Sequence, residues 1–143
     1  MVANVNDILA LVGPGKVITT HQIIESLGLE GTSYDNHEIN TRLRKLAEQG
    51  RLVKVIPTVY LDPADADKVD ALREEFENEI LSVLRFDAMI PFTEIESIIR
   101  KNDDRLRFGA IQAILRKLTA DKKIEMKEKK GYIRIPSDNT EGR

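Results

Sequence analysis

The chain has 143 residues, of which 41% are hydrophobic and 32% are charged, and its formal net charge is −2. This composition is typical of a folded, helix-rich protein, and the length suits one ordinary domain or two very small ones. There is no cysteine, which excludes disulfides, thiolate metal sites and cysteine nucleophiles and fits a cytoplasmic location. We expect no secretory leader, and no apolar run approaches the roughly 20 residues of a membrane span.

The charge is unevenly distributed along the chain. Between Asp62 and Glu79, eight acidic residues stand against two basic ones, a net charge of −6. Between Arg100 and Arg134, twelve basic residues stand against five acidic ones, a net charge of +7. A chain that is acidic overall can therefore still present a strongly basic face to a partner such as nucleic acid.

The chain contains an internal repeat. The block LRKL stands at Leu43–Leu46 and again at Leu115–Leu118. Displacing the sequence against itself by 72 residues aligns eleven identical residues without a gap, and most of them are apolar. The identical pairs are Asn6/Asn78, Ile8/Ile80, Leu9/Leu81, Ile18/Ile90, Ile23/Ile95, Ile39/Ile111, Leu43/Leu115, Arg44/Arg116, Lys45/Lys117, Leu46/Leu118 and Tyr60/Tyr132. Two copies of one fold are the simplest explanation.

Each copy begins with a predicted amphipathic helix, at 5–12 in the first copy and at 77–85 in the second. A turn and a short extended stretch follow, ending near Ile18 and Ile90. A second helix is then expected to start at a threonine. Thr20 is the expected N-cap in the first copy, and Thr93 with Glu96 has the spacing of a capping box in the second.

The third predicted helix has the clearest pattern, because its apolar residues are spaced by four and then three. The stripe is Ile39, Leu43 and Leu46 in the first copy and Ile111, Leu115 and Leu118 in the second. Gly50 is expected to end the first of these helices. Two pairs of short strands complete the copies, with predicted ranges 52–56 with 59–62 and 123–127 with 132–135.

A connector joins the copies. Asp62 followed by Pro63 has the pattern of an N-cap and a proline in the first turn, and 64–85 contains neither glycine nor proline. We therefore expect one continuous helix of about 22 residues, roughly 33 Å long. Its first half either folds back on the first copy or provides a dimer surface. The expected divisions are 1–63, the connector 64–76, 77–136, and a disordered tail at 137–143.

The segments INTRLRKLAEQGRLVKV (39–55) and IQAILRKLTADKKIEMK (111–127) resemble the third helix and first wing strand of the winged-helix superfamily. The resemblance implies a mainly α fold with small β-hairpin wings, as two tandem winged-helix domains joined by a long connector helix. The superfamily includes transcription regulators and replication initiators. It also includes tandem copies that bind only proteins, such as a condensin-associated segregation subunit and an endosomal sorting subunit.

In DNA-binding members of the superfamily, the third helix enters the major groove and the wing touches the backbone. The resemblance therefore implies a set of polar and basic contacts to duplex DNA. In the first copy these are Asn36, His37, Asn40, Thr41 and Arg44, and in the second they are Arg105, Arg107, Gln112, Arg116, Lys117, Lys127, Lys129 and Lys130.

These features favour a non-catalytic DNA-binding protein, a transcription regulator or an accessory factor in replication or partition, that needs no cofactor. No phosphate-binding loop or nucleophile elbow occurs, and we expect no metal site at His21 and His37. The alternative is a protein–protein scaffold. It would dock partners through the short apolar wing at 55–59, the connector helix and the acidic patch at 62–79. The first wing and the connector are also the expected surface for a homodimer or a protein partner.

Overall fold

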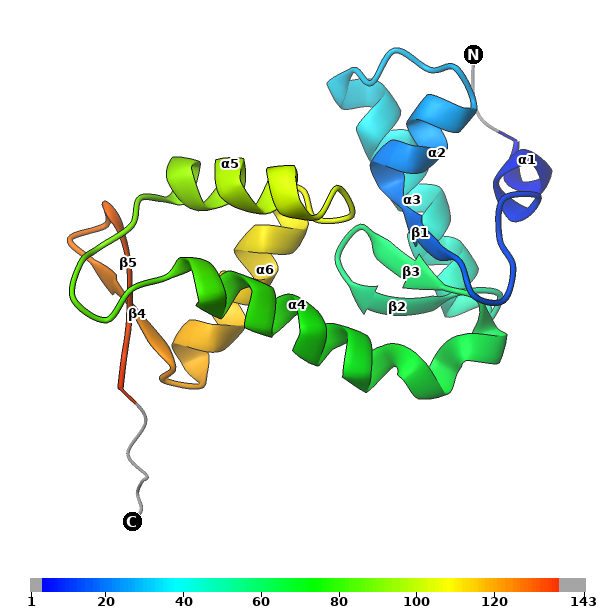
Figure 1. Cartoon of the computed structure of the whole chain (residues 1–143). Helices are drawn as coiled ribbons and strands as arrows, with labels where there is room; N and C mark the ends of the chain where they lie inside the picture. The colour runs from blue at the N-terminus through cyan, green and yellow to red at the C-terminus, as the bar shows by residue number, and fades with distance from the viewer. Residues whose placement is uncertain (1–3, 137–143) are drawn as a thin grey trace. The chain divides into compact units, whose positions relative to one another are not determined.

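The computed structural model describes residues 4–136 of the chain (Figure 1). The fold is mainly α with small antiparallel strand pairs, and it divides into two compact units between Arg73 and Glu74. We call these unit 1 and unit 2. The expected tail at 137–143 lies outside the described residues. Within the described range, no helix is long and apolar enough to cross a membrane.

Unit 1 contains three helices and a three-stranded antiparallel sheet with strand order β1-β3-β2. In chain order its elements are α1 (Val5–Leu9), β1 (Val17–Thr19), α2 (Thr20–Ser26), α3 (Ser33–Glu48), β2 (Val53–Ile56) and β3 (Val59–Leu61). The apolar stripe predicted on α3 is buried in the core of this unit, together with Ile8, Ile23 and Tyr60. The third helix is thereby held with its other face outward.

The connector differs from the continuous α-helix expected at 64–85. It begins as the 3₁₀ helix η1 (Pro63–Lys68), capped by Asp62 as predicted, and becomes the α-helix α4 (Val69–Val83). Asp65 inside η1 has non-helical backbone angles, φ −103° and ψ 17°. Its carboxylate accepts a hydrogen bond from the Gly15 amide at 2.7 Å, a contact that turns the chain away from a regular helix.

The first part of the connector folds back on unit 1. The 3₁₀ segment η1 packs against β2 and β3. Arg73, in the second turn of α4, donates from Nε to the Val55 carbonyl at 2.7 Å. Of the two arrangements considered from sequence, these contacts support the packing of this half on the first copy.

Unit 2 contains the rest of α4, α5 (Phe92–Asn102), α6 (Phe108–Ala120) and the hairpin of β4 (Ile124–Lys127) and β5 (Gly131–Arg134). An isolated bridge joins Ile90 to Tyr132, with both backbone N–H···O bonds at 2.9 Å. In unit 1, Ile18 pairs with Tyr60 in the same antiparallel sense. Because both partners are displaced by 72 residues, the repeat seen in the sequence extends to the backbone pairing.

The helix starts correct two predictions. The N-cap of α2 is Thr19, whose Oγ1 accepts from the Gln22 amide at 3.3 Å, and not Thr20. The N-cap of α5 is Pro91, which has no side-chain acceptor, so the capping box predicted at Thr93 does not form. The helix stop at Gly50 is confirmed by its φ of 78°, and the predicted strands agree to within about a residue at each end.

Candidate nucleic-acid interface

The outward face of α6 carries Phe108, Gln112 and Arg116. These residues are spaced by four, which places them on one side of the helix. All three are exposed, while Ile111 and Leu115 on the other side are buried. Among the residues that the structure describes, no acidic side chain pairs with Arg116. This face therefore offers an apolar ring, an amide and an unneutralised guanidinium.

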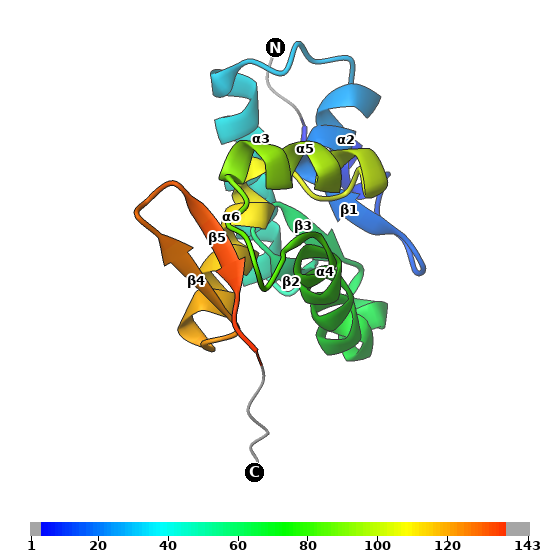
Figure 2. The ribbon, with the colours of Figure 1, turned by 60° about the vertical axis from the view of Figure 1, so that its left-hand side comes forward.

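The tip of the β4–β5 hairpin is the second basic feature of unit 2. Lys130 donates its amide to the Lys127 carbonyl at 2.9 Å, which closes a turn through Glu128 and Lys129. Both central residues have positive φ, 52° and 58°, the conformation of a type I′ hairpin turn. Figure 2 shows this tip projecting from unit 2. Lys129 and Lys130 are exposed there and have no acidic partner within residues 4–136.

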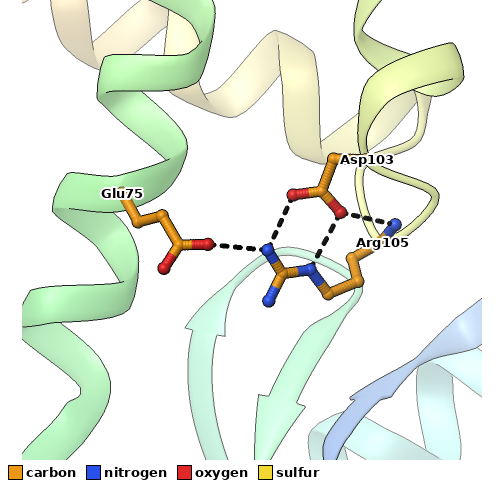
Figure 3. Close-up of polar contacts among 3 residues, drawn as sticks. All are labelled: Glu75, Asp103 and Arg105. Atoms are coloured by element: carbon orange, nitrogen blue, oxygen red, sulfur yellow. Dashed lines mark hydrogen bonds and ion pairs between the residues drawn. The ribbon is translucent and has the colours of Figure 1, made fainter.

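Arg105, in contrast, is paired with carboxylates of unit 2, and its side chain is 29% exposed. Its Nε and Nη2 donate to Asp103 at 2.8 and 2.7 Å, and Nη2 also reaches Glu75 at 2.7 Å (Figure 3). The guanidinium lies 5.0 Å from the centroid of the Phe76 ring. These contacts tie the turn before α6 to α4, and we leave Arg105 out of the proposed DNA-contacting set.

Three more basic candidates from the sequence are also engaged. Arg107 pairs with Asp104 at 2.8 Å, and Lys127 pairs with Glu125 at 3.4 Å. Lys117 lies between two carboxylates, 2.8 Å from Asp121 and 3.2 Å from Glu77, and these hydrogen bonds raise its pKa. The four engaged side chains are thus partly neutralised, and the unpaired charge among the candidates of unit 2 lies on Arg116, Lys129 and Lys130.

The candidates of unit 1 all lie on α3, but two of them serve the unit itself. Asn36 donates from Nδ2 to the Gly31 and Thr32 carbonyls at 3.1 and 3.0 Å, near the start of the helix. Asn40 Oδ1 accepts from the hydroxyl of the buried Thr20 at 2.5 Å, which joins α2 to α3.

The other three unit 1 candidates are closer to solvent. His37 and Arg44 are exposed, and Thr41 Oγ1 accepts from Arg44 Nη2 at 3.3 Å. Arg44 is the repeat partner of Arg116, so each unit presents an arginine at the same place on its third helix.

The acidic cluster at the start of unit 2 has no counterpart in the sequence-based predictions. Carboxylate oxygens of Glu75, Glu79 and Asp103 lie within 4.8 Å of one another. Burial, and then the adjacent Asp103 carboxylate, raises the pKa of Glu79 to about 7. Burial alone would also raise the pKa of Asp103, but hydrogen bonds with Arg105 and Glu79 hold it below its usual value. The cation in this cluster is the Arg105 side chain itself.

Phe108 was also missed from sequence. Its exposed fraction of 53% is high for an aromatic residue on a helix whose isoleucine and leucine side chains are all buried. The available signal was its position four residues before Gln112 and eight before Arg116. No family model, curated protein or solved structure matches the chain.

Proposed function

We propose that this chain is a non-catalytic duplex DNA-binding protein made of two tandem winged-helix units. Each unit has the order helix, extended segment, helix, helix, hairpin, and each third helix has one buried and one outward face. Such a helix is of the size and shape that enters a major groove, while the hairpin contacts the phosphate backbone.

The observation that carries the proposal is the unneutralised charge of unit 2. Arg116 on α6 and Lys129 and Lys130 at the hairpin tip are exposed, and no acidic side chain within residues 4–136 pairs with them. Phosphate contacts by such side chains supply most of the sequence-independent affinity for DNA. The four basic side chains that pair with carboxylates would instead preserve the shape of the surface on which these charges lie. They are Arg105, Arg107, Lys117 and Lys127.

The protein–protein scaffold has less support. One of its three supports, beside the connector and the acidic patch, was an apolar wing in unit 1, but Val55 and Val59 in that wing are only 1% and 0% exposed. The outermost residues of that turn are Pro57, which is exposed, and Thr58, which is partly buried. This turn therefore offers little apolar surface to a partner.

A salt titration tests the proposal. Binding to a generic duplex of about 20 base pairs, two helical turns, would be followed by fluorescence anisotropy at increasing salt. We expect micromolar affinity that falls steeply with salt. The triple variant Arg116→Ala/Lys129→Ala/Lys130→Ala should bind more weakly, and its log–log salt slope should be smaller by about 0.9 for each phosphate that the variant no longer neutralises.

A matched control removes the same charge elsewhere. Lys16, Arg51 and Lys101 are exposed and lie outside the proposed surface, so the variant Lys16→Ala/Arg51→Ala/Lys101→Ala should bind like the wild type. If both triple variants lost the same DNA affinity, binding would depend on the net charge of the protein and not on the proposed surface. The absence of binding by the wild type at about 50 mM salt would overturn the proposal.

A further inference from the structure

Phe108 occupies an unusual position for a large apolar side chain. It is the first residue of α6, and 53% of its surface is exposed. Its ring packs edge-to-face on Phe92, the first residue of α5, with centroids 5.3 Å apart and an interplanar angle of 73°. Because Phe92 supports one edge, the ring has a defined orientation and keeps a free apolar surface.

The same position in unit 1 is polar. Asn36 stands 72 residues before Phe108, and its amide is bound to the backbone of its own helix start. At this position in unit 1, the second and third helices are joined by the Thr20–Asn40 hydrogen bond, in addition to their shared apolar core. In unit 2 the equivalent contact includes the Phe92–Phe108 pair. The exposed ring is therefore a property of unit 2 and not a requirement of the repeated fold.

The side chains that share a face of α6 with Phe108 indicate which groups of a DNA duplex this face would contact. Gln112 and Arg116 follow one and two turns later, so the three side chains span about 12 Å along the helix, or three to four base steps. In the major groove, glutamine pairs with adenine, arginine pairs with guanine or a phosphate, and an apolar side chain contacts the 5-methyl group of thymine.

We infer that Phe108 recognises the thymine 5-methyl group in the major groove, which gives unit 2 a preference for duplexes with a thymine beside an adenine. This inference rests on the proposed DNA-binding function and adds a residue that determines sequence preference. Arg116 holds the helix on the duplex, Gln112 faces adenine, and the Phe108 ring covers the methyl group.

Deoxyuridine provides a direct test, because it lacks only that methyl group. Binding would be compared between alternating d(AT) and d(AU) duplexes of about 20 base pairs, which carry the same charge. The wild type should bind d(AT) about threefold to fourfold more tightly, the factor that burial of one methyl-sized group supplies. Phe108→Ala should bind both duplexes equally, and Phe108→Leu should retain part of the preference.

Phe86→Ala is the matched control, since Phe86 is 51% exposed but lies in the segment after α4, 4.8 Å from the Arg134 guanidinium. It should keep the full preference, and circular dichroism should show that all variants are folded. A wild type that binds both duplexes equally, or a preference that persists in Phe108→Ala, would overturn the inference and leave DNA binding standing. If the wild type binds neither duplex, both proposals fail.

Discussion

The carboxyl group of Glu79, on α4, lies against the carboxylate of Asp103, which ends α5. The pKa values of the two groups are shifted in opposite directions. Burial and the adjacent Asp103 raise the pKa of Glu79 from 4.5 to about 7. Asp103 stays ionised because, against its burial, hydrogen bonds with Arg105 and Glu79 lower its pKa. A proton on Glu79 therefore stabilises the packing of α4 on the rest of unit 2.

This arrangement predicts a pH-dependent stability. Between pH 4.5 and about 7 the folded chain binds the Glu79 proton more tightly than the unfolded chain does. The stabilisation is complete below pH 4.5 and is lost as the pH rises through 7. Glu79→Gln should be more stable than the wild type at about pH 8, and its free energy of unfolding should change less over this range, as measured by urea denaturation.

Glu75→Gln is the control for this prediction. It removes an equal charge from the same cluster, but at a side chain that is 54% exposed. The variant should lose an ion pair with Arg105 and retain most of the pH slope of the wild type, because burial and Asp103 raise the pKa of Glu79 more than the Glu75 charge does. If Glu79→Gln and the wild type show the same slope, the proton on Glu79 does not contribute to stability.

Arg105 gives a second prediction, because its ion pairs with Asp103 and Glu75 are expected to stabilise the fold and not to contact DNA. Arg105→Ala leaves Asp103, whose side chain is 6% exposed, without its ionic partner. We expect a decrease of about 2–3 kcal/mol in the free energy of unfolding. Arg105→Lys should recover only part of it, since lysine cannot reproduce the two-pronged contact.

The comparison variant is Arg100→Ala, which removes a looser ion pair with Glu96 at 3.9 Å and should cost less than about 0.5 kcal/mol. Under conditions where Arg105→Ala remains folded, its affinity for generic duplex DNA should match that of the Arg100→Ala variant. A selective loss of DNA affinity in Arg105→Ala would restore Arg105 to the interface.

The features that sequence could predict are those set by local spacing. The stripe Ile39, Leu43, Leu46 predicts α3 because burial of one helix face needs only a period of 3.6 residues. The 72-residue repeat showed that Tyr60 and Tyr132 are equivalent, and the structure adds that they pair with the equivalent residues Ile18 and Ile90. The break at Asp65 was not, because it depends on a hydrogen bond to Gly15, 50 residues earlier.

The same distinction applies to the candidate site. The sequence located a basic segment, and composition cannot show which of its charges are neutralised. Arg105 pairs with Glu75, 30 residues away, and Lys117 pairs with Glu77, 40 residues away, and only the folded chain brings these groups together. Arg116 remained a candidate because it has no such partner among the described residues.

Gly131 supports a third prediction. A Cβ atom at this position would lie 2.6 Å from the Ile90 carbonyl oxygen and 2.7 Å from Met89 Cγ. Gly131→Ala must therefore push the Ile90 segment away from β5, at a cost of about 1–3 kcal/mol. The Tyr132 amide, which donates to the Ile90 carbonyl, should exchange its hydrogen faster.

Gly13→Ala is a suitable control because the nearest atoms to its Cβ belong to the flexible Lys16 side chain, at 3.8 and 3.9 Å. That variant should differ from the wild type by no more than about 0.5 kcal/mol. Unchanged exchange at Tyr132 in Gly131→Ala would show that the Ile90 bridge does not require a glycine.

Thr58 supports a fourth prediction, of a substitution that stabilises the fold. It follows Pro57 in the β2–β3 turn and has a φ of 74°, a conformation unfavourable for a β-branched residue. Thr58→Gly should raise the free energy of unfolding by about 1 kcal/mol, because glycine adopts this conformation without strain. Thr58→Ala retains a Cβ and should gain much less, so equal stabilisation by both variants would contradict this explanation.

The last prediction concerns the two arginines that the repeat places on the third helices. Arg44 on α3 and Arg116 on α6 are both exposed, and neither has an acidic partner in the part of the chain that the structure describes. If both units contact DNA, Arg44→Ala and Arg116→Ala should each reduce the salt slope of binding by about 0.9, and the double variant by about 1.8. Arg42→Ala, which breaks a 3.6 Å pair with Glu38 on α3, should leave the slope unchanged. A slope that responds to Arg116→Ala but not to Arg44→Ala would confine DNA binding to unit 2. The outward face of α3, with Tyr34 61% exposed in its first turn, would then be free to bind another protein.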